Sequence, residues 1–277
     1  MIRGYSEDLR LISYKLKIIL DNLSSMGISV GNNSRFHQFS KLLDRYYHSL
    51  LKGQKFKDEM LIELLDGFKS YMQLSVITGS PIIMNDGKKD LTKIFGGSNS
   101  PLNEGNNHQP RDFQFELYTA AKFHRAGFVI RLEEPDFLFH FKGKIYGVAA
   151  KRVTLGGIEK NLKKADHQIR VTNNYGFIAI SLDRLYEERN RIMEIIDPDY
   201  SVRKVNEIIE NTIRGTFSNT YFSNRSDQVL GIIASVSIPY ILPRMELGYT
   251  SYMMFMPIKQ DGTAEWNEAI SISGMFG

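Results

Sequence analysis

Residues 115–153 read FELYTAAKFHRAGFVIRLEEPDFLFHFKGKIYGVAAKRV, and this stretch decides the fold class. Residues 112–126 carry apolar side chains at helical spacing, and Gly127 is typical of the position just after a helix. Beyond the glycine, aromatic and β-branched residues replace that spacing and predict three consecutive strands. The strands are expected at 128–132, 136–141 and 144–153. A helix followed by these strands predicts a mixed α/β, or α+β, domain.

Further elements are expected on both sides of this stretch. Downstream, the pattern predicts a basic amphipathic helix at 158–171 and then a strand at 176–182. Upstream, three amphipathic patterns at 7–26, 35–51 and 57–74 predict an N-terminal helical bundle. The other elements expected are a helix at 201–216 and strands at 228–241 and 249–258.

The composition between the bundle and the strands indicates a linker. Residues 96–110, GGSNSPLNEGNNHQP, are rich in Gly, Ser, Asn and Pro and have almost nothing apolar to bury. A chain of 277 residues is long enough for one large domain or two small ones. We therefore expect a helical N-terminal domain at 1–95, a linker at 96–110 and a second domain at 111–277.

Composition excludes several classes of site. The chain has no cysteine, which excludes disulfides, thiolate zinc sites and a cysteine nucleophile. The net charge of +4 is mild, and no apolar run approaches the roughly 20 residues of a membrane span. The N-terminus has no apolar signal segment, so we expect a cytoplasmic protein without membrane contact. Any metal would need oxygen or imidazole ligands.

One spacing pattern carries chemistry. Asp136 opens a strand after Pro135, and residues 149 and 151 of the next strand point to the same face of the sheet. An acid at 149 and the ammonium of Lys151 would therefore project together toward Asp136. Carboxylate oxygens are preferred Mg²⁺ ligands, and a nearby lysine stabilises a hydroxide or a developing phosphoryl charge. Each of these residues has an ordinary structural explanation when it is taken alone, so the prediction of a site depends on their occurrence together.

The segment 115–153 resembles the core of the PD-(D/E)xK nuclease superfamily. In that pattern a helix acid precedes a β-hairpin that carries Asp and then (Asp/Glu)-x-Lys. The resemblance covers roughly residues 111–185, about a quarter of the chain. It implies a restriction-endonuclease-like mixed sheet flanked by helices, and it implies metal-dependent hydrolysis of phosphodiester bonds.

The resemblance also implies roles for individual residues. Asp136 and the backbone carbonyl of Ala150 would ligate Mg²⁺ or Mn²⁺, and Lys151 would assist the nucleophile. Glu116, in the preceding helix, would complete or support the metal site. Gln168, in the following helix, matches a position at which some branches of the family hold a glutamine that orients the site.

Residue 149 departs from the family pattern, because it is Ala where the family has Asp or Glu. Alanine has no side-chain oxygen with which to hold a cation, so the site as written is impaired. Three interpretations stay open: an inactivating substitution of an original acid, natural degeneration to a binding module, and a misplaced motif. The first is favoured because the pattern around the gap is intact.

These inferences lead to a metal-dependent nuclease as the first hypothesis, inactivated here by Ala149. DNA, as a duplex, is the favoured substrate, and RNA stays open. The helix at 158–171 would contact backbone phosphates, which gives affinity without sequence choice. The basic residues expected to make these contacts are Lys160, Lys163, Lys164 and Arg170.

Two rival functions stay open: a non-catalytic nucleic-acid-binding module on the same fold, and a helical adaptor whose second domain mediates assembly. The N-terminal helices are expected to position substrate or a protein partner subunit, and a homo-oligomer is compatible with the sequence. By analogy at the family level, such a nuclease also resembles the effector of a bacterial restriction or anti-phage system.

Overall fold

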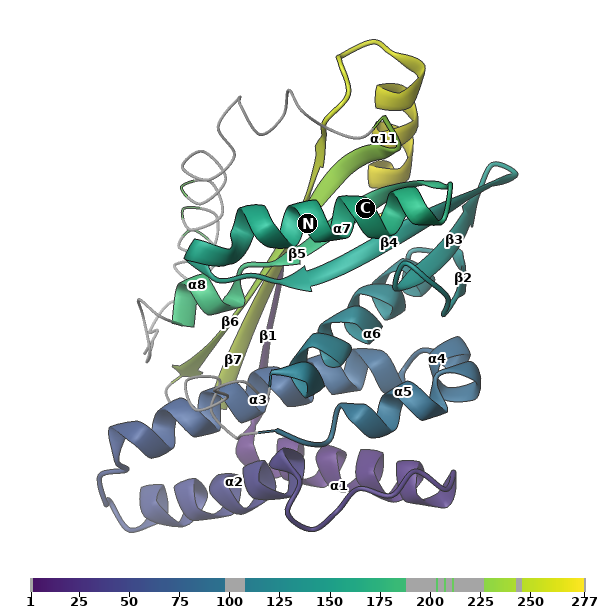
Figure 1. The fold of residues 1–277 in the computed structure, drawn as a ribbon. Coiled ribbons are helices and arrows are strands. Elements are labelled where there is room, and N and C mark those ends of the chain that lie inside the picture. Colours follow the sequence, from purple (N-terminus) through teal and green to yellow (C-terminus); the bar gives the residue numbers. More distant parts are fainter. Residues whose placement is uncertain are drawn as a thin grey trace.

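A seven-stranded mixed sheet forms the centre of the molecule (Figure 1). The computed structural model describes residues 2–97, 108–187, 203, 207, 211, 227–242 and 246–276. The strands are β1 (Ile2–Asp8), β2 (Val129–Arg131), β3 (Phe137–Phe141), β4 (Lys144–Arg152), β5 (Tyr175–Ser181), β6 (Val229–Leu242) and β7 (Glu246–Pro257). Their order across the sheet is β1-β7-β6-β5-β4-β3-β2. The expected α+β class is confirmed.

Strand direction changes across the sheet. β4, β5 and β6 run parallel to one another, whereas all other neighbours are antiparallel. The hairpin between β3 and β4 turns at Lys142 and Gly143, both of which have positive φ angles. Its register pairs Phe137 with Val148, so that Asp136, one residue earlier, comes opposite Ala149.

Helices cover both faces of the sheet. α7 (Ile158–Val171) packs on one face of β4 and β5, and α6 (Gln109–Arg125) packs on the other face (Figure 1). α3 (Asp58–Thr78) lies beside α6 and reaches β6 and β7. The apolar stripe expected on α7 is confirmed, and its buried residues are Ile158, Leu162, Ala165 and Ile169.

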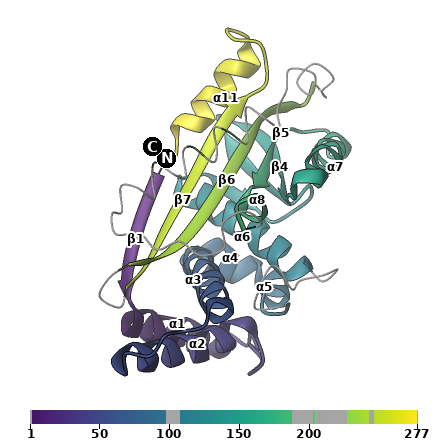
Figure 2. The same cartoon turned by 90° about the vertical axis from the view of Figure 1, so that its left-hand side faces the viewer.

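The remaining helices lie at the periphery. α1 (Leu9–Ser25) and α2 (Arg35–Leu51) pack against each other and against α3, below the sheet in Figure 2. The short helices are α4 (Pro81–Asp86), α5 (Lys88–Lys93) and α8 (Asp183–Glu187), and α11 (Ala264–Gly274) packs on β6 and β7. No helix in the described part of the chain combines the length and apolar character needed to cross a membrane.

The chain begins with a strand that the sequence analysis did not predict. A helix was expected from residue 7, but residues 2–8 form β1, which pairs along β7 from Ile2 with Tyr252 to Asp8 with Glu246 (Figure 2). The helix starts at Leu9 because the Asp8 carboxylate accepts a hydrogen bond from the Arg10 amide, at 2.8 Å.

Hydrophobic contacts continue from the N-terminal helices into the sheet. One cluster of buried side chains includes residues of α1, α2 and α3 together with β3, β4, β6 and β7. The division into units at 1–95 and 111–277 stays a prediction, but the two share this core. The linker expected at 96–110 and the helix expected at 201–216 fall largely outside the described residues.

A buried ionic network also joins the N-terminal helices to the sheet. In α3, Asp66 lies 2.6 Å from Nη2 of Arg111 in α6 and 3.5 Å from Nζ of Lys69. Lys69 lies 3.7 Å from Oδ2 of Asp183, whose Oδ1 accepts a hydrogen bond from the Ser237 amide of β6. All four charged side chains are buried, so their pairing is a condition of stable packing.

Candidate functional site

Asp136 and Lys151 form the centre of the candidate site. Oδ2 of Asp136 accepts a hydrogen bond from the Ala150 amide at 2.6 Å and another from Nζ of Lys151 at 2.9 Å. The two side chains are only 11% and 13% exposed. The carboxylate thus links the residue just before β3 to two consecutive residues of β4.

The Lys151 ammonium has a second oxygen partner. Its Nζ also lies 2.9 Å from the carbonyl oxygen of Ala150. Burial raises the pKa of Asp136 above its ordinary value, while attraction to Lys151 and the bond from the Ala150 amide oppose the rise. The two oxygens expected to bind a metal are therefore both bonded to the ammonium.

Gln168 fixes the loop that carries Asp136. Its Nε2 donates a hydrogen bond to the Pro135 carbonyl at 3.2 Å, which ties α7 to the residue just before the aspartate. Its Oε1 is buried and accepts no hydrogen bond from the described residues. The sequence analysis placed Gln168 at the site, and the structure brings it to the backbone beside the site.

Glu116 lies on α6, on the other face of the sheet from α7. Its carboxyl group interacts electrostatically with Asp136 and Lys151. Its pKa is raised to about 8. Burial is the largest cause, the negative charge of Asp136 comes next, and the ammonium of Lys151 opposes both. Asp112 and Asp90 add a smaller rise. At neutral pH the Glu116 side chain is therefore mostly protonated and uncharged.

Ala149 lies in the hydrophobic core. It is fully buried, in an apolar cluster with Leu162 and Ala165 of α7, on the face of β4 that alternation assigns to Lys151. Ala150 belongs to the other cluster, on the side of α6. A longer side chain at 149 would enter the cluster beneath α7, next to the lysine.

The sequence analysis missed a second ion pair beside the site. Nη1 of Arg152, the residue after Lys151, lies 3.4 Å from Oδ1 of Asp112. Asp112 precedes Glu116 by one helical turn on α6, and His108 lies 3.6 Å from its other oxygen. The i, i+4 spacing of the two acids was a usable signal, but the partner on β4 depends on packing.

The basic residues expected on α7 are all exposed, but they differ in pairing. Lys163 lies 2.6 Å from Glu159, and Arg170 lies 3.2 Å from Asp166, both as i, i+4 pairs. No described carboxylate pairs with Lys160 or Lys164. Because exposed ion pairs contribute only about 0–1 kcal/mol, the paired side chains remain able to turn toward another anion.

The donor set does not fit Mg²⁺ in this chain. Among the residues that the structure describes, no group of three or more His, Asp or Glu side chains is placed to hold a metal ion. Glu116 is mostly neutral, Ala149 offers no oxygen, and Lys151 already bonds to the two remaining donors. Divalent cations need several oxygen ligands, and the described side chains around Asp136 do not offer them.

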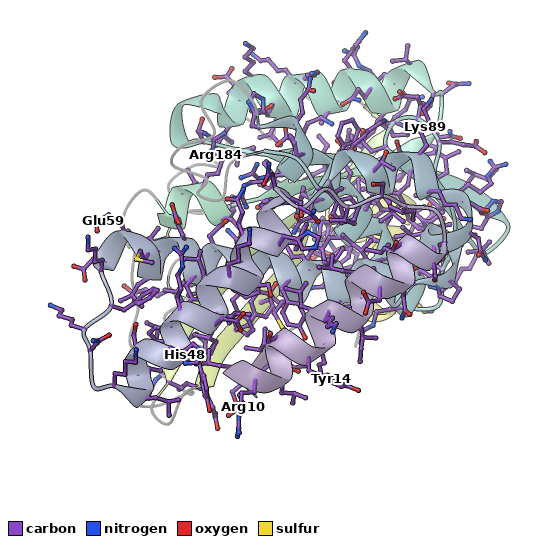
Figure 3. All side chains as sticks on the ribbon, turned by 90° about the horizontal axis from the view of Figure 1, so that it is seen from below. Arg10, Tyr14, His48, Glu59, Lys89 and Arg184 are labelled. Carbon is purple, nitrogen blue, oxygen red and sulfur yellow. The ribbon has the colours of Figure 1, made fainter. Side chains whose placement is uncertain are left out.

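The N-terminal helices present a separate surface groove of about 740 Å³ between α1 and α2. Arg10 and Tyr14 of α1 and His48 of α2 are among its lining residues, and Figure 3 shows them on this side of the molecule. Tyr14 is 64% exposed. A protein partner was expected to bind through these helices, and that expectation stays a prediction.

The sequence matches no known protein family, and comparisons with curated proteins and with solved structures give no match either. The candidate site is therefore interpreted from the residues of this chain alone.

Proposed function

We propose that this chain has the fold and the site of a metal-dependent nuclease of the PD-(D/E)xK type, in a form that Ala149 inactivates. The observation that carries the proposal is the joint contact of Asp136 with the Ala150 amide and the Lys151 ammonium at the end of the hairpin. That contact joins Asp136 and Lys151, the two specified hairpin residues of the family pattern that this chain has. The proposed substrate is nucleic acid, with duplex DNA favoured.

The chain's own residues have definite tasks in this proposal. Lys151 supplies a positive charge that stabilises an attacking hydroxide or the charge that develops on a phosphoryl oxygen. Asp136 orients that ammonium, and Gln168 holds the loop before Asp136 in place. Mg²⁺ or Mn²⁺, bound with the help of an acid at 149, would supply Lewis-acid catalysis.

Ala149→Glu is the variant that tests the proposal. With Mg²⁺ or Mn²⁺ present, we expect Ala149→Glu to cleave duplex DNA and the chain as written to leave it intact. Ala149→Gln is the matched control, because glutamine has the same size but no charge. A second control, Asp136→Asn combined with Ala149→Glu, should be inactive. If Ala149→Glu cleaves neither DNA nor RNA with either metal, the nuclease assignment is wrong.

Nucleic-acid binding by the chain as written is the second candidate function. It is favoured by the exposed Lys160 and Lys164 and by the donor set that does not fit a metal. Salt-dependent binding without cleavage in both the chain as written and Ala149→Glu would support this candidate. A role as an effector in bacterial anti-phage defence, held inactive by a protein partner, belongs to the proposal only by analogy with the family.

A further inference from the structure

A second cavity lies at the C-terminal end of α6. It has a volume of about 650 Å³ and is formed by the C-terminal end of α6, one part of β7 and the end of α11. Known ligand pockets span about 300–1,000 Å³, so the cavity has the size for a small organic molecule. None of the residues assigned to the nuclease site lines it.

Two cations stand at the rim of this cavity. Lys122 and Arg125 both line it, and no described carboxylate pairs with either of them. They occupy the last turn of α6, whose carbonyl end carries negative partial charge, so the positive charge at the cavity comes from these two side chains and not from the helix. Nζ of Lys122 lies 5.0 Å from the centre of the Tyr118 ring, within the range of a cation–π contact. The rim therefore offers two positive charges to an anion.

Part of the cavity lining is apolar and adaptable. Phe255 and Phe276 line it with ring centres 4.6 Å apart, and both rings are only partly buried. Met253, Met254 and Met275 also line it, and methionine side chains adjust to ligands of different shape. An apolar body can thus be buried beneath the two cations.

We propose that this cavity binds a small amphipathic anion, with its charged group between Lys122 and Arg125 and its apolar body on Phe255 and Phe276. The two positive charges favour a negatively charged head group, and the aromatic rings favour an apolar body. A medium-chain carboxylate and a nucleoside monophosphate share this chemistry. The cavity is independent of the candidate nuclease site, so its test does not depend on the proposed function.

The test is calorimetric titration of the full chain with two matched pairs of probes. Decanoate is compared with decanol, and adenosine monophosphate is compared with adenosine. We expect at least one anion to bind with one-to-one stoichiometry and about tenfold or more tightly than its uncharged partner. The anion that binds shows whether the cavity accepts a fatty carboxylate or a nucleotide.

Two variants locate the binding. Lys122→Gln with Arg125→Gln should weaken the anion by about tenfold or more, whereas Lys88→Gln with Lys89→Gln removes two exposed lysines elsewhere and should change nothing. Ser273→Trp places an indole ring at a lining position, takes up part of the cavity and should weaken binding. Absence of saturable binding by both anions, or equal affinity of the Lys122/Arg125 variant and the parent, overturns the proposal.

Discussion

Lys151 Nζ lies 2.9 Å from Asp136 Oδ2 and 2.9 Å from the Ala150 carbonyl oxygen. The ammonium thus takes two oxygens that a divalent cation would need. A metal that binds Asp136 has to compete with a positive charge already in place, and a second acid beside Lys151 would change that competition. An acid at 149 would both supply a ligand and give the lysine another partner.

Ala149→Glu should lower stability in the absence of divalent cations and regain it when Mg²⁺ or Mn²⁺ is added. The larger side chain enters the apolar cluster beneath α7, which costs about 1–3 kcal/mol, and the desolvation of a buried carboxylate adds to the cost. A metal at 100 times its Kd would return about 2.7 kcal/mol.

Thermal melts with and without each cation measure this effect. Ala149→Gln serves as the control, because it overpacks the same cluster without a charge and should not respond to metal. Equal metal responses of the Glu and Gln variants would mean that residue 149 does not face a cation.

Glu116 should make stability depend on pH in a defined window. Its pKa rises from an ordinary value of 4.5 to about 8 on folding, so the folded chain holds a proton that the unfolded chain has released. The free energy of unfolding should therefore fall as the pH rises from about 4.5 to about 8. Glu116→Gln should flatten this fall.

Urea unfolding at a series of pH values measures the slope. Glu159→Gln is the matched control, because Glu159 is fully exposed and its pKa is lowered by a hydrogen bond from Lys163, so it titrates below the window. A Glu116→Gln variant with the same slope as the parent contradicts the buried, neutral state of this side chain.

The lysines of α7 should set the salt dependence of nucleic-acid binding. Replacing Lys160, Lys163 and Lys164 by Gln should weaken duplex binding and reduce the slope of log affinity against log salt by about 0.9 for each phosphate that the variant no longer neutralises. Stability should stay within about 0.5 kcal/mol, since the buried stripe of the helix is untouched.

A control set of three lysines lies on α2 and in the loop between α2 and α3. Lys41, Lys52 and Lys55 are also exposed, and their replacement by Gln should leave the salt slope unchanged. Binding titrations at several salt concentrations compare the two triple variants with the parent. If only the Lys41, Lys52 and Lys55 variant reduced the salt slope, the phosphate-binding surface would lie on the N-terminal helices and not on α7.

Asp66→Asn should destabilise the chain by about 3–5 kcal/mol, because it leaves Arg111 and Lys69 buried without their shared carboxylate. Burial alone raises the pKa of Asp66, but these cations outweigh it and the net shift is downward. Urea unfolding measures the loss. Asp21→Asn, at an exposed position of α1, should change stability by less than about 0.5 kcal/mol. Similar values for both variants would show that the network contributes little.

The elements with strong local patterns were predicted closely. The helix expected at 158–171 is α7, and the strands expected at 136–141 and 144–153 are β3 and β4 within one residue at their ends. Apolar periodicity and a tight turn decide these elements within a short stretch of chain. β1 was missed because residues 2–8 have no such pattern and become a strand only by pairing with β7, more than 200 residues away.

The sequence alone determined which residues of the candidate site share a face, because alternation along β4 places 149 and 151 together wherever the strand lies. Only the tertiary structure decided that Lys151 bonds to both Asp136 and the Ala150 carbonyl, and that Glu116 is mostly neutral at pH 7. The reason is physical: contacts between a helix and a strand, and the loss of water around a carboxyl group, arise from packing between distant segments, which no local pattern encodes.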